Sequence, residues 1–215
     1  RWKQYLEGMA TTLYVTVIAI LIGIVLGVIV ASIRTAHDQQ RRKKNIVLGF
    51  FNAICKIYVT VIRGTPMMVQ LMILGFVVFK SSRNFTMVGA LGLGLNSGAY
   101  VAEIIRGGLM SLDRGQSEAG RSLGLGYMDT MRFIVVPQAF KAVLPALGNE
   151  FIILLKDTSL LTIIGGKELV HAAQGIMNRT WEQMFPLLGI SFLYLVLILS
   201  WLQGKLERRL RQSER

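Results

Sequence analysis

Three long stretches without any charged residue constrain this chain more than any other feature of its sequence. Residues 8–33 form an uncharged run of 26, residues 183–204 a run of 22, and residues 84–102 a run of 19. A helix needs about 20 apolar residues to cross the hydrocarbon core of a bilayer. Only 17% of the residues are charged, against roughly 25% in an average soluble domain. The sequence therefore predicts a protein whose helices span a membrane.

Two further apolar segments are interrupted by polar residues. Residues 46–79 carry Lys56, Arg63 and the break Gly64-Thr65-Pro66, and at about 1.5 Å per residue they are too long for one perpendicular crossing. We interpret them as an interfacial or cytoplasmic lead-in followed by one span. Residues 133–155 are apolar but include two prolines, a lysine and a glutamate. Because polar groups cannot face lipid, we expect this crossing to lie among other helices.

These segments predict an all-α integral membrane protein that forms one domain over residues 1–215. A short cytoplasmic helix is expected in residues 112–127, between the third and fourth spans. Glycines four residues apart, Gly23 with Gly27 and Gly94 with Gly98, would let helix backbones approach closely in lipid. The five expected spans are approximately 9–33, 46–79 with a break at 63–66, 85–108, 131–155 and 184–205.

The basic residues of the chain are unevenly distributed between the two sides of the membrane. The net charge is +12, from 24 Lys and Arg against 12 Asp and Glu. The loops 34–45, 106–132 and 205–215 hold 14 basic residues, whereas the loops 1–7, 80–83 and 167–182 hold six. The more basic side is expected to be cytoplasmic, which places the N-terminus outside and the C-terminus inside. We interpret Arg41-Arg42-Lys43-Lys44 as a topology anchor near anionic lipid rather than a nucleic-acid patch.

A long spaced motif lies between the third and fourth spans. Glu118-Ala119-Gly120 is followed after three residues by Gly124, and nine residues later by Ile134-Val135-Val136-Pro137. This pattern resembles the E-A-A-x3-G-x9-I-x-L-P signature of ABC importer permeases. Gly120 stands in place of the second alanine and Val136 in place of leucine.

Three other segments are similar to the polar amino acid branch of the same family: Arg63-Gly64-Thr65-Pro66, Asn96-Ser97-Gly98-Ala99-Tyr100-Val101-Ala102-Glu103 and Lys156-Asp157-Thr158-Ser159-Leu160. The resemblance covers about residues 8–205. It implies a type I importer membrane domain in a prokaryotic cytoplasmic membrane. It also implies a second permease subunit, identical or homologous, two cytoplasmic ATPase subunits and an extracytoplasmic solute-binding protein. ATP and Mg²⁺ would then bind the partner subunits, and this chain would hold no cofactor and catalyse no reaction.

Residues 112–127, named here the coupling loop, are expected to dock on the ATPase. Gln116 or Ser117 can open a short helix with Glu118 near its positive end. Leu123 and Leu125 offer apolar side chains to a partner groove, and Gly124 allows a tight turn. The alternative is a solvated amphipathic connector. The residues expected to couple the subunits are Glu118, Ala119, Gly120, Arg121, Leu123 and Gly124.

Three carboxylates, those of Glu103, Glu150 and Asp157, fall within predicted spans or at their ends. Each needs a partner or a water-filled cavity, because a charge at the bilayer centre costs about 2.5–3.5 kcal/mol. Glu150 and Asp157 are seven residues apart, as are Asn96 and Glu103, so each pair shares a helix face. The acids would bind the ammonium of a zwitterion, and backbone N–H groups at a broken helix would bind its carboxylate. The expected substrate site comprises Asn96, Ser97, Glu103, Glu150, Asp157, Thr158 and Ser159.

Internal ion pairs are the alternative for these acids: Glu103 with Arg106, and Glu150 and Asp157 with Lys141 or Lys156. If the acids instead face a cavity, the surplus of negative charge favours an amino acid with a cationic side chain.

We therefore expect the permease subunit of an ATP-driven ABC importer that translocates polar amino acids, including cationic ones, by alternating access. A self-sufficient, ion-coupled secondary transporter is the alternative. Five spans in one short chain, the lack of an inverted repeat and the loop motif argue against it.

Other chemistry finds no support in the sequence. A G-x-x-x-x-G-K-[ST] motif is lacking, so a P-loop for ATP is not expected. His37 and His171 are far apart and Cys55 is the only cysteine, so no zinc site is expected. Ser97 and Ser159 have no His and Asp partners at a telling spacing, which disfavours serine hydrolysis. We expect no catalytic site, no metal site and no nucleic-acid binding.

Overall fold

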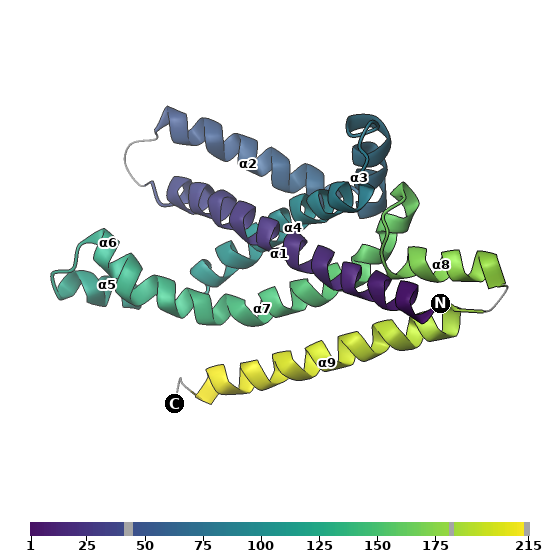
Figure 1. The fold of residues 1–215 in the computed structure, drawn as a ribbon. Helices are drawn as coiled ribbons and strands as arrows, with labels where there is room; N and C mark the ends of the chain where they lie inside the picture. Colours follow the sequence, from purple (N-terminus) through teal and green to yellow (C-terminus); the bar gives the residue numbers. More distant parts are fainter. Residues whose placement is uncertain (41–44, 181–182, 213–215) are drawn as a thin grey trace.

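The computed structural model describes residues 1–40, 45–180 and 183–212, and every regular element in these ranges is helical (Figure 1). The basic run 41–44 lies outside the described residues. The long helices are α1 (Trp2–Asp38), α2 (Ile46–Gly64), α4 (Phe85–Met110), α7 (Val136–Asp157) and α9 (Phe185–Gln212). The shorter ones are α3 (Met67–Ile73), α5 (Arg114–Ser122), α6 (Tyr127–Thr130) and α8 (Leu169–Thr180). Two π-helical turns, η1 (Leu74–Val78) and η2 (Met131–Val135), follow α3 and precede α7, and the 3-10 helix η3 (Thr158–Ile164) follows α7.

Five helical segments are long and apolar enough to cross a bilayer: Trp2–Asp38, Ile46–Gly64, Phe85–Met110, Tyr127–Ile164 and Phe185–Leu210. The all-α fold with five spans is thereby confirmed. The helices extend into the expected loops, because residues 34–38 belong to α1, residues 106–110 to α4 and residues 205–212 to α9.

The second segment differs from its interpretation. Asn45 begins α2 by accepting hydrogen bonds from the backbone N–H groups of Val47 (3.0 Å) and Leu48 (3.4 Å). The helix ends at Gly64 because Pro66 disfavours helical backbone in the residue before it, and Thr65 is extended. The 19 residues of α2 are long enough to cross, whereas the apolar stretch after the break, Met67–Val78, is shorter. The crossing segment therefore precedes the break rather than following it.

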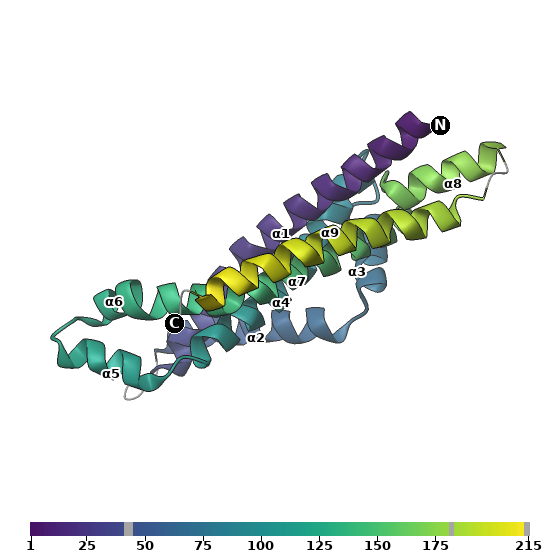
Figure 2. The ribbon, with the colours of Figure 1, turned by 90° about the horizontal axis from the view of Figure 1, so that it is seen from below.

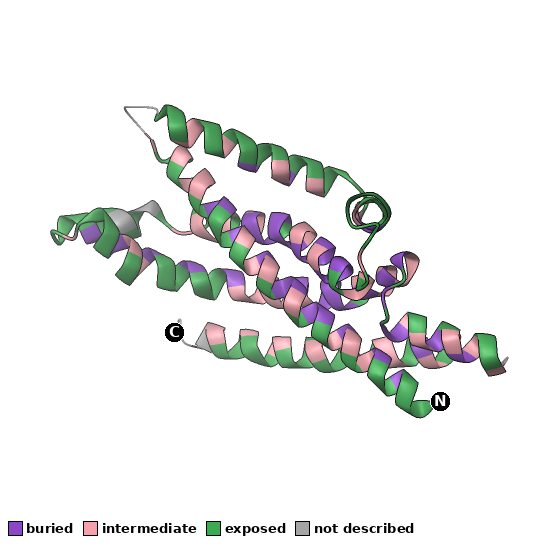
Figure 3. Cartoon of the chain, turned by 45° about the horizontal axis from the view of Figure 1, so that its top comes forward, coloured by how far each residue is buried: buried purple, intermediate pink, exposed green. Residues whose placement is uncertain are grey.

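The core lies where α1 packs along α4, which is the most extensive contact between two helices. Both glycine pairs lie in this contact. A methyl group added at Gly27 would lie 2.5 Å from Val101 Cγ1 and 3.0 Å from Ala102 N, and one at Gly94 would lie 2.7 Å from Ile22 Cβ. Buried residues concentrate on α1 and α4, whereas α2 and α9 are mostly exposed along their lengths (Figure 3). The small residues thus bring two backbones together, as their spacing predicts.

The two ends of the helix bundle carry different segments (Figures 1 and 2). The N-terminus and α8 lie at one end, and α5, α6 and the C-terminal part of α9 lie at the other. At this second end the Tyr127 hydroxyl donates a hydrogen bond to Oε1 of Gln39, 2.7 Å away, next to the end of α1. The coupling loop is therefore attached to α1 as well as to α7.

Glu168 is a fully buried carboxyl outside the spans. It accepts hydrogen bonds from the backbone N–H groups of Val170 (2.7 Å) and His171 (2.9 Å), and it thereby caps α8. The adjacent N–H of Leu169 donates to Thr12 Oγ1 of α1 at 3.2 Å. Burial raises the pKa of Glu168 to about 7, and the two backbone hydrogen bonds oppose this rise only in part.

We expect the heat stability of the detergent-solubilised protein to fall as the pH rises through about 7, with Glu168 as one cause. An ordinary glutamate titrates near 4.5, so between 4.5 and about 7 the folded state holds a proton that the unfolded chain releases. This stabilisation is fully present below the lower value and is lost as the pH passes the higher one. Glu168→Gln should flatten the dependence of the melting temperature on pH, whereas the exposed control Glu7→Gln should not. An unchanged slope in Glu168→Gln would contradict the assignment.

Candidate functional site

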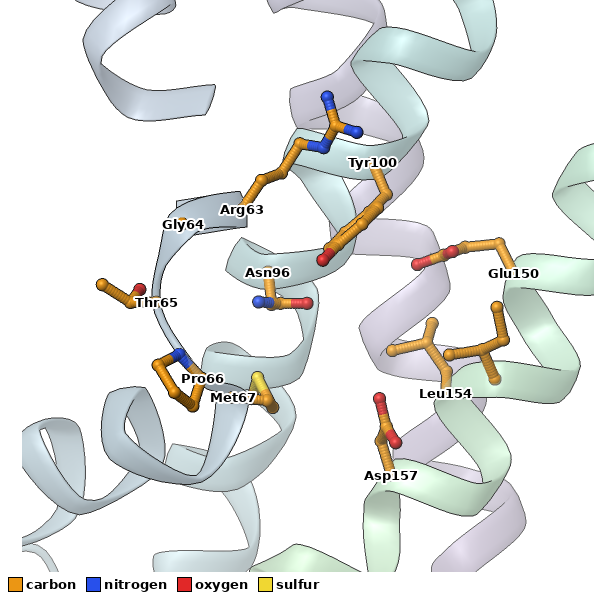
Figure 4. A pocket seen from close by; sticks show the side chains of 11 residues that line it. Arg63, Gly64, Thr65, Pro66, Met67, Asn96, Tyr100, Glu150, Leu154 and Asp157 are labelled. Carbon is orange, nitrogen blue, oxygen red and sulfur yellow. The ribbon is translucent and has the colours of Figure 1, made fainter. Parts of the chain in front are cut away.

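A cavity of about 500 Å³ lies between the α2–α3 break, α4 and α7 (Figure 4). Binding sites for small molecules have volumes of about 300–1,000 Å³. Its charged lining residues are Glu150 and Asp157 from α7 and Arg63 from the end of α2. The other lining residues are Gly64, Thr65, Pro66, Met67, Asn96, Tyr100, Ile153 and Leu154. The cavity therefore offers charges of both signs in a small volume between membrane-spanning helices.

The two acids of α7 share one helix face, as their spacing predicts, and both line the cavity (Figure 4). Glu150 is buried, and its Oε1 accepts a hydrogen bond from Ser97 Oγ of α4 at 2.8 Å. Asp157 is the last residue of α7. This placement favours the cavity over internal pairing for both acids, and their role toward a substrate stays a prediction.

Asn96 of α4 lines the cavity and forms a hydrogen bond with Gln70 of α3. Asn96 Nδ2 donates to Gln70 Oε1 at 3.1 Å. The Gln70 amide nitrogen in turn donates to the carbonyl oxygens of Ile62 (2.8 Å) and Thr65 (3.0 Å), which the broken helix leaves without helical partners. One glutamine side chain thus fixes the break and orients the asparagine.

Arg63 supplies the positive charge of the cavity. Its guanidinium carbon lies 5.4 Å from the ring centroid of Tyr100, which is within the range of a cation–π contact. Tyr100 follows Asn96 by four residues, so both side chains lie on one face of α4. The sequence-based site missed Arg63 as a binding group, and also Tyr100 and Gln70. The motif Arg63-Gly64-Thr65-Pro66 could have indicated Arg63, since it places a charged residue next to a helix break.

The structure corrects the placement of Glu103, which lies outside the cavity lining. Its Oε1 accepts from Arg34 of α1, and its Oε2 accepts from Arg106 Nη2 at 3.1 Å. Arg63 Nη1 is 4.0 Å from Oε2. The seven-residue spacing from Asn96 carries Glu103 two turns along α4, past the end of the cavity. The alternative of internal pairing with Arg106 is the correct one for this acid.

Three hydroxyl residues of the expected site also lie outside the lining. Ser97 is buried and donates to Glu150, so it supports the cavity without facing it. Thr158 donates to the carbonyl of Leu155 and Ser159 to that of Lys156, both at 2.7 Å. These bonds arise because α7 tightens into η3 at this point, where hydroxyls can cap the last carbonyl groups.

The coupling loop contains a helix that begins earlier than expected. Asp113, rather than Gln116 or Ser117, caps α5, and its Oδ1 accepts from Gly115 N at 3.0 Å. Glu118 therefore lies in the middle of α5 rather than at its positive end. Gly120 is buried and packs against Thr130 and Ile134. The neighbouring motif residues Glu118, Ala119 and Arg121 are exposed.

A Schellman motif ends α5 at Gly124. The N–H of Gly124 donates to the carbonyl of Arg121 (2.9 Å) and the N–H of Leu125 to that of Gly120 (3.1 Å). Gly124 has φ of +82°, which side chains of L-residues disfavour. The turn leaves the side chain of Leu123 81% exposed at the end of the bundle. An exposed apolar residue on a fixed turn suits a protein partner, and the docking role of the loop stays a prediction.

Substitution of Gly124 is expected to weaken attachment of a partner protein at this loop. Gly124→Ala should cost about 1–2 kcal/mol of loop stability, because the left-handed backbone is strained for alanine. Gly124→Asn tolerates this backbone better, and Gly124→Asp adds a charge to the same shape. Co-purification with the ATPase subunit that the motif implies should fall in the order Gly, Asn, Asp. Equal recovery of ATPase with all variants would show that the loop is a passive connector.

In the described part of the chain, no group of three or more His, Cys, Asp or Glu side chains lies close enough together to hold a metal ion. His37 lies against Asn52 and Asp38 at the cytoplasmic end expected for α1, with Nδ1 3.2 Å from Asn52 Nδ2. His171 is exposed on α8.

Comparison with known proteins gives concordant similarities over nearly the whole chain. A family model described as the binding-protein-dependent transport system inner membrane component matches residues 46–212. The arginine transport system permease protein ArtQ of Bacillus subtilis is 35% identical, with 97% of this chain and 93% of that protein covered. The glutamine transport system permease protein GlnP of Escherichia coli K12 is 34% identical, with 96% and 92% covered.

Solved structures show the same architecture. The crystal structure of an amino acid ABC transporter with histidines matches with a TM-score of 0.83 at 35% identity, over 96% of this chain and 94% of that one. An inward-facing structure of the MetNI methionine ABC transporter matches with a TM-score of 0.80 at 18% identity, over 96% of each chain, which shows the fold alone.

Proposed function

Because the chain belongs to the family of binding-protein-dependent transport system inner membrane components, we propose that its cavity is where a polar amino acid crosses the membrane. The chain is a permease subunit of an ABC importer for amino acids, and the family is one of transport permeases rather than enzymes. The observation that carries the proposal is that Glu150, Asp157 and Arg63 all line one cavity next to a helix break.

The charges of the cavity match those of a free amino acid. The carboxylates of Glu150 and Asp157 bind the α-ammonium group, and the Arg63 guanidinium binds the α-carboxylate with charge-assisted hydrogen bonds. Asn96, fixed by Gln70, supplies neutral donors and acceptors. Two acids against one base leave one negative charge in excess, which favours a substrate whose side chain is cationic. That a relative is named for arginine transport agrees with this class.

Transport proceeds by alternating access between two permease subunits, driven by ATP on partner chains. The coupling loop docks on a cytoplasmic ATPase subunit through Leu123 and the exposed residues of α5. ATP and Mg²⁺ bind those subunits, and this chain holds no cofactor. A solute-binding protein delivers the substrate to the opposite end of the bundle, where α8 and the N-terminus lie.

The N-terminus is outside and the C-terminus is in the cytoplasm in this proposal. The bundle places α8 and the coupling loop at opposite ends (Figure 2), and the more basic end carries the loop. In a Cys55→Ser background, a single cysteine at Gln40 should react with a membrane-impermeant maleimide only after the cells are opened. A cysteine at Asn178 should react in intact cells. Labelling of Gln40→Cys from outside would overturn this topology.

Reconstituted uptake tests the function directly. Proteoliposomes that contain the permease, its ATPase and the solute-binding protein should accumulate L-arginine, L-lysine, L-histidine or L-glutamine only with ATP inside. A panel of amino acids defines the preference. Uptake that needs an ion gradient and no ATPase would instead establish a secondary transporter, and failure to accumulate any amino acid would refute the proposal.

A further inference from the structure

Four charged residues form an ion-pair cluster beside the cavity: Arg34, Arg63, Glu103 and Arg106. Three arginines from α1, α2 and α4 surround the single carboxylate of Glu103. Only Arg63 belongs to both places, since it also lines the cavity. The cluster and the cavity therefore share one side chain.

The three arginines are held with unequal strength. Arg34 and Arg106 hydrogen bond to separate oxygens of Glu103, and their side chains are 16% and 27% exposed. Arg63 is 4.0 Å from Glu103, beyond hydrogen-bond range, and its side chain is 45% exposed. The Tyr100 ring is its other neighbour. Arg63 is thus attracted to Glu103 while its N–H groups are left for another acceptor.

We propose that Glu103 is a positioning residue, which holds Arg63 at the cavity wall so that it can bind the carboxylate of the substrate. This inference rests on the proposed function, because the carboxylate is that of the transported amino acid. Glu103 itself does not touch the substrate and acts only through Arg63.

The reason lies in the balance of charge within the cluster. With Glu103 ionised, one negative charge separates three positive ones. Without it, three guanidinium groups would repel one another across short distances. The most exposed and most weakly held of them would move, and that is Arg63. The loss of a carboxylate outside the cavity should therefore weaken recognition of a carboxylate inside it.

The test compares two ligands that differ only in this group, L-arginine and L-argininamide. Equilibrium binding is measured on the purified permease–ATPase complex without the solute-binding protein, whose own recognition of the carboxylate would mask the cavity. The wild type should prefer L-arginine. Arg63→Gln and Glu103→Gln should each reduce this preference roughly tenfold, because each removes one charge-assisted contact from the ligand. The exposed controls Arg83→Gln and Glu7→Gln make the same charge changes elsewhere and should keep it.

A double variant separates positioning from a merely structural role. If Glu103 acts through Arg63, the combined variant should show the preference of Arg63→Gln alone, because effects through one shared contact do not add. The melting temperature, which depends also on Arg34 and Arg106, should fall further in the double variant than in Arg63→Gln alone. Glu103→Asp, which keeps the charge but shortens the side chain, should give an intermediate preference. If Glu103→Gln yields no folded complex, Glu103→Asp decides by the same assay.

Each outcome has a distinct meaning. If Glu103→Gln or Glu103→Asp prefers L-arginine over L-argininamide as strongly as the wild type does, the inference is overturned. A stronger preference would also overturn it, because it would show that Glu103 merely offsets the charge of Arg63. Wild-type complex that transports amino acids but does not distinguish the two ligands would also overturn it and leave the transport function intact. Absence of ATP-driven uptake by the wild type would instead refute the proposed function.

Discussion

Replacement of Asp157 by asparagine is expected to reduce ATP-driven amino acid uptake by roughly ten- to a hundredfold. A charge-assisted hydrogen bond contributes about 1.5–3 kcal/mol, which corresponds to that loss of occupancy. Asparagine keeps the shape of the side chain, so extraction yield and basal ATP hydrolysis should change little. Glu150→Gln should reduce uptake to a similar extent, because it also removes one negative charge from the cavity. Its fold should be kept, because glutamine can still accept the hydrogen bond from Ser97.

Ser159→Ala is the matched control for this prediction. Ser159 belongs to the same sequence motif as Asp157, but its hydroxyl bonds to a backbone carbonyl and does not line the cavity. Uptake by this variant should therefore stay close to that of the wild type. Normal uptake by Asp157→Asn would refute the cavity as the site of transport. A collapse in folded yield would show that the acid is part of the structure instead.

Gly27→Leu is expected to destabilise the protein more than any single change at the site. Even the first carbon of a side chain at Gly27 would lie 2.5 Å from Val101 Cγ1 and 3.0 Å from a backbone nitrogen of α4. Overpacking in a close-packed core costs about 1–3 kcal/mol or more, and here a whole helix would have to move. The melting temperature in detergent and the yield of monodisperse protein should both fall sharply.

The corresponding control is Gly49→Leu. Gly49 lies within α2, where nothing approaches an added Cβ within 4 Å. Because leucine favours helix more than glycine does, this variant should be as stable as the wild type or slightly more so. Equal melting temperatures for Gly27→Leu and Gly49→Leu would mean that α1 and α4 do not depend on their close approach.

The spans were predictable because a bilayer imposes a length of uncharged helix that a sequence displays directly. The glycine pairs were predictable for a related reason, since spacing along one helix decides which residues share a face. The same rule placed Glu150 and Asp157 correctly on one wall. It misplaced Glu103, because spacing shows that two residues face the same way but not where the cavity ends.

Contacts between distant segments could not be read from the sequence. Arg34 and Glu103 are 69 positions apart, and only the packing of α1 on α4 brings them together. Tyr100 and Arg63 meet by the same kind of tertiary contact. The early start of α5 has a local cause, since Asp113 caps it and aspartate is as good a helix cap as serine. The predicted caps were only Gln116 and Ser117, whereas Asp113 caps the helix.

The nearly continuous helical segment Tyr127–Ile164 joins the coupling loop to the cavity acids. At about 1.5 Å per residue, the path from Tyr127 to Asp157 is about 45 Å long, so a tilt of about 5° at the cavity would displace the far end by about 4 Å. In the proposed transporter, this segment would work as a lever arm. A small rearrangement at the cavity would then become a larger displacement at the coupling loop, where we propose that an ATPase subunit docks.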